Sequence, residues 1–139
     1  MTDNVIRNDM DVQLNGDTGN NYDRVWQQAA GTTGGGAGVS GGSSVAAGAF
    51  PYAWTAGLTA TAGESTTSQL WIYNYSGTTF QKKMMAVTNN FSSTGFADFF
   101  VQQFSGHWRN TAAVTSIKLL DSGAGNIVAG SVFSLYGIR

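Results

Sequence analysis

A scarcity of helix-favouring residues is the feature that most constrains the fold of this chain. Among 139 residues there are one glutamate and three lysines, and only 11% of the sequence is charged, against roughly 25% in an average soluble domain. No window shows the hydrophobic period of an amphipathic helix. Glycine is abundant instead, with 19 copies, and eight Phe, five Tyr and four Trp supply material for a core. We therefore expect an all-β fold.

The charge balance and the lack of cysteine exclude several classes of protein. Seven basic residues face eight acidic ones, so the basic surplus of a nucleic-acid binder is missing. Without cysteine there is no disulfide framework and no thiolate metal site, and a single histidine excludes multi-histidine zinc sites. The start of the chain lacks the pattern of a signal peptide, and no apolar stretch approaches the ~20 residues of a membrane span. We expect neither a nucleic-acid nor a membrane partner.

Short runs of β-forming residues between turn-forming residues favour an antiparallel β-sandwich of jelly-roll type. Strands are expected at residues 22–28, 69–75, 80–88, 96–104, 114–120 and 131–138. In the last expected hairpin, Ile117 and Leu119 would pack against Phe133 and Leu135 across the turn.

Two stretches are expected to lie outside the core. Five of the eight acidic residues fall within the first 23 positions, with few aliphatic residues beside them. We interpret residues 1–20 as an extended N-terminal arm and residues 21–139 as one β-sandwich domain. Residues 31–49 contain eight glycines and are interpreted as a flexible loop, or a loop over the surface of a partner.

Motifs that suggest enzyme chemistry lack the context that such chemistry needs. Residues 36–41 spell G-x-G-x-x-G, but no hydrophobic strand precedes them and no helix follows. Ser40 lies in a G-x-S-x-G motif and is followed by Asp98 and His107, yet the strand–turn–helix of a nucleophile elbow is missing. The carboxylates beyond the first 23 positions are Glu64, Asp98 and Asp121. They are too few to predict a glycosidase pair, so we expect neither an enzyme nor a cofactor.

Other polar residues are interpreted as solvated or protective. Asp9, Asp11, Asn15 and Asp17 carry oxygen ligands, but their spacing misses the calcium-loop pattern. His107 is interpreted as a surface residue beside a packed tryptophan. Adjacent Lys82 and Lys83 point to opposite faces of a strand, so they form no patch, and we interpret them as guards against edge-to-edge pairing.

The last third of the chain carries the most distinctive pattern. Residues 106–120 read GHWRNTAAVTSIKLL, and residues 125–138 read GNIVAGSVFSLYGI. This succession of G-x-W, an A-V-T-S-I-x-L strand, a G-N turn and a G-S-x-F-x-L-Y-G-I ending resembles small structural proteins of tailed-bacteriophage virions. The resemblance is close over about 35 residues, and it brings no catalytic motif with it.

What the resemblance implies is a capsid decoration or cement protein that binds the outer shell and stabilises it. Its partners would be the major capsid protein and further copies of itself, as a homotrimer or homodimer. It would be assembled in the host cytoplasm and reside on the capsid surface. The capsid contacts are expected on the arm and just after it, at Arg7, Asp9, Asp11 and Tyr22.

The alternative function is a receptor- or glycan-binding module of a tail fibre or spike. Trp71, Tyr73 and Tyr75 alternate along one expected strand and so share a face. Aromatic rings in such a row can stack on sugar rings, and they can equally form a core or a subunit contact. The candidate stacking residues are Trp54, Trp71, Tyr73, Tyr75 and Trp108.

Overall fold

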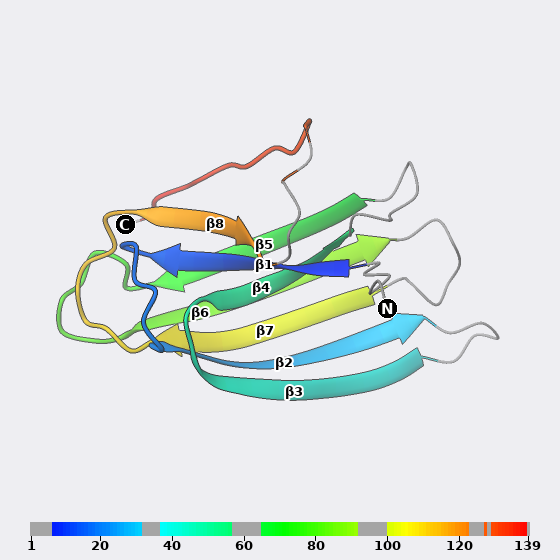
Figure 1. Ribbon diagram of the computed structural model, residues 1–139, viewed down its shortest axis with the longest axis horizontal. Coiled ribbons are helices and arrows are strands. Elements are labelled where there is room, and N and C mark those ends of the chain that lie inside the picture. The colour runs from blue at the N-terminus through cyan, green and yellow to red at the C-terminus, as the bar shows by residue number, and fades with distance from the viewer. Residues whose placement is uncertain are drawn as a thin grey trace.

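In the part of the chain that the computed structural model describes, eight antiparallel strands form a two-layered β-sandwich (Figure 1). The structure describes residues 7–31, 37–56, 65–91, 100–122, 127 and 129–138. The strands are β1 (Arg7–Leu14), β2 (Tyr22–Gly31), β3 (Ala37–Ala47), β4 (Phe50–Ala56), β5 (Ser65–Tyr73), β6 (Lys82–Phe91), β7 (Phe100–Trp108) and β8 (Ile117–Asp121). One sheet has the order β4-β1-β8 and the other the order β3-β2-β7-β6-β5. The predicted antiparallel sandwich is confirmed, whereas this strand order does not confirm the jelly-roll subtype.

The core lies between the two sheets and is built from alternate positions of their strands. β7 shows the pattern most clearly, with Phe100, Phe104 and Trp108 buried while Val101 and Gln103 are exposed. A side chain on every second residue points to the same face of a strand, so each central strand contributes one apolar face. The main cluster contains Met10, Val12, Leu14, Tyr22, Phe50, Tyr52, Ala53, Met84, Ala86, Phe104 and Trp108.

The expected hairpin in the middle of the chain is confirmed. β5 pairs with β6 from Ser65 opposite Phe91 to Tyr73 opposite Lys83. The expected strand at 22–28 is confirmed and runs on to Gly31. The strand expected at 96–104 begins at Phe100 within the described residues, because 96–99 lie outside them.

The N-terminal arm is a wrong prediction for residues 7–14. They form β1, the middle strand of the three-stranded sheet, which pairs with β4 on one side and β8 on the other. Val12 and Leu14 are fully buried. The alternation of Met10, Val12 and Leu14 supplies a buried face, so the acidic residues between them do not keep the strand in solvent. Residues 1–6 lie outside the described residues.

The prediction of a glycine-rich loop is wrong for residues 37–47, which form β3 at the end of the five-stranded sheet. Two close approaches explain why glycine is tolerated in this strand. A Cβ at Gly41 would lie 2.7 Å from the backbone oxygen of Trp26, and one at Gly42 would lie 3.0 Å from the Nε1 atom of its indole. At both positions, atoms of Trp26 on β2 therefore occupy the space that a side chain would need.

The prediction of a last strand at residues 131–138 is also wrong. Residues 129–138 form no strand, and Phe133 and Leu135 are exposed rather than packed across a turn. β8 pairs instead with β1, with Leu119 opposite Val12 and Ile117 opposite Leu14. β1 therefore takes the place in the sheet that the final strand was expected to fill.

Candidate interaction surfaces

Three of the four residues expected to contact a capsid are buried or half-buried. Tyr22 is fully buried, and its hydroxyl accepts a hydrogen bond from the backbone N–H of Leu14 at 2.9 Å. Asp9 and Asp11 are half-buried on β1, near Arg24 of β2, with 3.9 Å between the Arg24 Nη2 and Asp9 Oδ2 atoms. Arg7 begins β1, but its side chain lies outside the described residues. Tyr22 therefore belongs to the core, and Asp9 and Asp11 belong to the middle strand of the three-stranded sheet.

The Asp9–Asp11–Arg24 group combines burial with incomplete hydrogen bonding. Burial raises the pKa of Asp9, against the nearby charge of Arg24. Burial, reinforced by the charges of Asp9 and Asp121, raises the pKa of Asp11 to about 6. The Asp11 Oδ1 atom and the Arg24 Nε and Nη1 atoms are buried without a hydrogen-bond partner in the described part of the chain. Such a group lowers the stability of the fold at neutral pH, because its charged form is poorly solvated.

Of the five aromatic candidates for glycan stacking, two are exposed. Trp71 and Tyr73 are 37% and 48% exposed on the outer face of β5, as their alternation predicts. Tyr75 is half-buried after the strand. Trp54 packs in the interior at 5.6 Å between its ring centroid and that of Trp26. Trp108 is buried and donates a hydrogen bond of 2.7 Å from Nε1 to Asp17.

Lys82 is a buried structural cation rather than an edge guard. β6 lies between β7 and β5, and the Lys82 side chain is fully buried while Lys83 is exposed. Its ammonium group donates to the carbonyl oxygens of Gly77, Phe80 and Thr111, at 2.7, 3.0 and 2.9 Å. All three N–H groups are thereby satisfied, and burial lowers the pKa of the lysine. The expected opposite orientation of the two lysines is confirmed, but the protective role is wrong.

A second polar cluster joins β2 and β7 at the same end of the sheet. The Asp23 carboxylate accepts hydrogen bonds from Arg109 Nε at 2.8 Å and from the Ala46 backbone N–H at 2.9 Å. His107 Nε2 lies 3.1 Å from the same carboxylate. The hydrogen bonds from Arg109 lower the pKa of Asp23 to about 2. His107 is therefore oriented by its contact with the Asp23 carboxylate, beside the buried Trp108.

The described residues do not assemble the catalytic or metal-binding groups that the motifs suggested. Ser40 lies opposite Gln28 and His107 opposite Asp23, so five residues of β2, or about 17 Å, separate them along the strand. Asp98 and Glu64 lie outside the described residues. In the described ranges no three His, Cys, Asp or Glu side chains gather where they could hold a metal ion. Nor does that part of the chain contain a helix suited to crossing a membrane.

Beyond the row of Asp23, His107, Lys83 and Tyr73, the outer face of the five-stranded sheet presents a broad uncharged surface. Its residues form three rows across the strands. The rows are Ser43, Val25, Ser105, Met85 and Trp71; Gly41, Gln27, Gln103, Val87 and Gln69; and Val39, Ala29, Val101, Asn89 and Thr67. None of them is charged, and all but the half-buried Met85 are exposed. A surface without charge over so many neighbouring positions is typical of a contact face rather than a solvated one.

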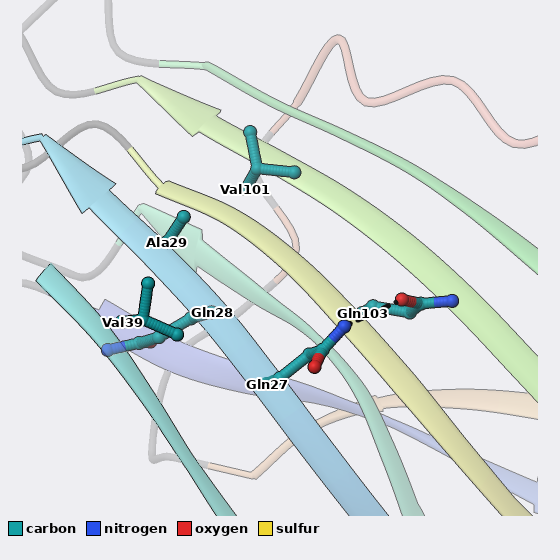
Figure 2. Close-up of a pocket in the computed structure, with 6 residues that line it drawn as sticks. All are labelled: Gln27, Gln28, Ala29, Val39, Val101 and Gln103. Carbon is teal, nitrogen blue, oxygen red and sulfur yellow. Dashed lines mark hydrogen bonds between the residues drawn. The ribbon is translucent and has the colours of Figure 1, made fainter. Parts of the chain in front are cut away.

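One end of this face is hollowed. A cavity of about 240 Å³ is lined by Gln27, Gln28, Ala29, Val39, Val101 and Gln103. Figure 2 shows Val39, Ala29 and Val101 side by side on β3, β2 and β7, with a hydrogen bond of 3.0 Å from Gln27 Nε2 to Gln103 Oε1 next to them. Its lining is uncharged and combines three glutamines with three apolar side chains.

The C-terminal segment, residues 129–138, is the most exposed apolar part of the described chain. It runs along one rim of the sandwich, beyond β8 (Figure 1). Its large apolar side chains are exposed by 53 to 87%; they are Val132, Phe133, Leu135, Tyr136 and Ile138. Because the sequence pattern predicts a strand here, it does not identify this segment as an exposed surface. The signal in the sequence was its shortage of polar residues at every second position, which a strand with one solvated face would carry.

No protein-family model, curated protein or solved structure matches this chain.

Proposed function

We propose that the protein is a structural virion protein of a tailed bacteriophage, which decorates the outer capsid surface and stabilises the shell. The resemblance of residues 106–138 to small virion proteins supports this role. The observation that carries it is the exposed C-terminal segment, whose apolar side chains are left in solvent by the described chain. Exposed apolar patches of this kind mark sites of protein–protein contact.

The C-terminal segment, rather than an N-terminal arm, is the part that docks on the major capsid protein in this proposal. Burying one large apolar side chain contributes about 1.5–3 kcal/mol. Several such side chains offset the cost of association and of ordering an extended segment. Many copies on one shell would each add a further contact, which strengthens attachment without any covalent step.

The first experiment is the copy number of the protein in purified particles of the virus that encodes it, measured by quantitative mass spectrometry. A copy number comparable to that of the major capsid protein supports a decoration role on the head. A much smaller number would place the chain on the tail and favour receptor binding. Absence from the particle would contradict the virion proposal.

The docking segment is tested by comparing two exposed substitutions in a shell-binding assay. L135E places a charge in the C-terminal segment, and we expect at least ten-fold weaker binding to shells. V25E is the matched control, because Val25 is also exposed and apolar but lies on the outer face of β2. If V25E weakens binding and L135E does not, the outer sheet face is the docking surface and the assignment to the segment is wrong.

A second candidate function is glycan binding, which the exposure of Trp71 and Tyr73 on one face favours. Lys83 lies opposite Tyr73 on the same face and adds a hydrogen-bond donor. W71A is expected to abolish binding on a glycan array if this function holds. Phe80 is 71% exposed outside this row, so F80A is the control. An array on which the unmodified protein binds no glycan would contradict it.

A further inference from the structure

The free edge of β3 shows none of the features that usually protect an edge strand. β3 ends the five-stranded sheet, and no other described strand pairs with its outer side. It is 11 residues long, and its sequence AGVSGGSSVAA contains no charged residue and no proline. Val39 and Val45 are 78% and 71% exposed. Half of the backbone hydrogen-bonding groups of such a strand point away from the sheet, ready to pair with another strand.

The sequence of β3 is nearly the same read in either direction from Gly42. Val39 and Val45 are equally distant from this centre, as are Ser40 and Ser44, and the innermost positions are all glycine or serine. In an antiparallel pair of identical strands, residues equally distant from the centre lie opposite each other. A strand with this symmetry therefore matches a second copy of itself along its length.

We propose that the protein forms a homodimer in which β3 of each copy pairs antiparallel with β3 of the other, around a two-fold axis at Gly42. The two five-stranded sheets then become one continuous ten-stranded sheet. Val39 lies opposite Val45 of the partner subunit on the outer face, and Ser40 lies opposite Ser44 of the partner subunit on the inner face. This inference rests on β3 alone and holds whether or not the protein is a virion component.

Two features favour a second copy over a different partner. An uncharged strand meets its own copy without like-charge repulsion, and two valine pairs fit the cross-strand contacts that stabilise sheets. The local fold also limits the pairing to residues 39–45. Ala46 has a φ of 54°, and its N–H donates to Asp23 at 2.9 Å, so the strand leaves its regular register there. The contact is small, so we expect a dimer that dissociates on dilution.

Sedimentation of the full chain at increasing concentration tests the proposal, with paired charges as the main probe. V39E/V45E places like charges opposite each other twice, and we expect at least a ten-fold increase in the dissociation constant. V39K/V45E places opposite charges there, so we expect the dimer to return. Circular dichroism of each variant establishes that it is folded. F80E adds a charge at an exposed position between β5 and β6, at the opposite end of the sheet order from β3, and should dimerise like the unmodified protein.

Cysteine cross-linking tests the register directly, because the chain has no cysteine of its own. Positions 39 and 45 are about 20 Å apart within one copy, so V39C/V45C can form disulfides only between copies. We expect covalent dimers from this pair on mild oxidation and none from V39C or V45C alone. Four results would overturn the proposal: an unmodified protein that stays monomeric at every concentration, a trimer, equal cross-linking by single cysteines, or no rescue by V39K/V45E.

Discussion

Residues 7–14 and residues 131–138 are two eight-residue stretches that differ in how far their apolar side chains are buried. Residues 7–14 alternate apolar with polar residues from Asp9 onward, whereas residues 131–138 carry adjacent apolar pairs and no charge. In β1, Met10, Val12 and Leu14 are at most 6% exposed, whereas in the C-terminal segment Leu135 and Tyr136 are more than 80% exposed. The acidic stretch is thus in the core and the uncharged one is in solvent.

The difference lies in the partners of each stretch rather than in its own composition. β1 pairs with a strand on either side and covers the five-stranded sheet with its apolar face. The C-terminal segment pairs with no described strand. Hydrophobic burial contributes free energy only where another surface removes water, so the exposed apolar side chains of the C-terminal segment contribute little to the stability of the fold.

Truncating one leucine in each stretch tests the contrast and has the largest expected effect. Leu14 is fully buried, so L14A is expected to lower the free energy of unfolding by about 3–5 kcal/mol through lost contacts and a cavity. L135A is expected to change it by less than about 0.5 kcal/mol. Urea unfolding of both variants measures the difference. Equal losses would mean that the C-terminal segment is part of the core.

The buried Lys82 supports β1 indirectly, through the chain that leads into β8. Its bond to the carbonyl of Thr111 holds that connection against the turn at Gly77. K82M keeps the volume but leaves three carbonyl groups without their donor, so we expect a loss of about 2–3 kcal/mol in the free energy of unfolding. K83M, on the exposed neighbour, is the control. A K82M protein as stable as the K83M protein would show that these bonds contribute little.

Asn15 fixes the end of β1 to the same connection. Its backbone is left-handed, with a φ of 54°, which asparagine tolerates. Its side chain donates to the carbonyl of Ala113 at 2.8 Å and accepts from the N–H groups of Thr115 and Ser116 at 2.8 and 3.1 Å. N15A removes these bonds, and thermal unfolding should show a loss of about 1–2 kcal/mol. N15G also removes the side-chain hydrogen bonds but adds no backbone strain, because glycine adopts this left-handed conformation freely. Comparing N15G with N15A therefore separates the two contributions to stability. If N15A and N15G both match the unmodified protein, the side chain of Asn15 does not hold β8 in place.

The sequence was sufficient for the fold class and for the hairpin of β5 and β6. There, β-forming residues on both sides of Ser76-Gly77 make a local pairing that neighbours in the chain determine. β1 could not be assigned in the same way. Its partners β4 and β8 lie about 40 and 110 residues away, and no local pattern announces such long-range pairing.

The interaction surfaces were harder to predict than the core. Trp71 and Tyr73 were correctly expected to share one face of a strand, because alternation alone decides this. The structure adds that this face is exposed. The exposure of Val39 depends instead on β3 lying at the end of its sheet, and that of Leu135 on the absence of a described strand beside it. Both exposures follow from the order of the strands in the two sheets, and no local sequence pattern predicts that order.

The pH dependence of stability is the smallest of these effects, and it separates a buried β1 from a solvated arm. The pKa of Asp11 is raised to about 6 in the folded protein, above its ordinary value of 3.8. Between about pH 4 and pH 6 the folded state therefore binds more protons than the unfolded state, so stability falls as the pH rises through this window. Below it, both states are protonated and the full contribution is present.

D11N removes this titration, so its stability should decline less from pH 4 to pH 6 than that of the unmodified protein. Part of the decline remains, because burial also raises the pKa of Asp9. At pH 7 we expect the variant to be more stable by about 1 kcal/mol, a modest gain because solvent reaches part of the carboxylate and screens it. Urea unfolding at pH 4, 5, 6 and 7 measures the two curves. D121N is the comparison, because Asp121 contributes to this shift only through its charge near Asp11. Parallel curves for D11N and the unmodified protein would mean that Asp11 is solvated, as an arm residue would be. A difference in slope confined to this window would instead show that the fold buries the acidic residues of β1 at a cost, which its apolar face offsets.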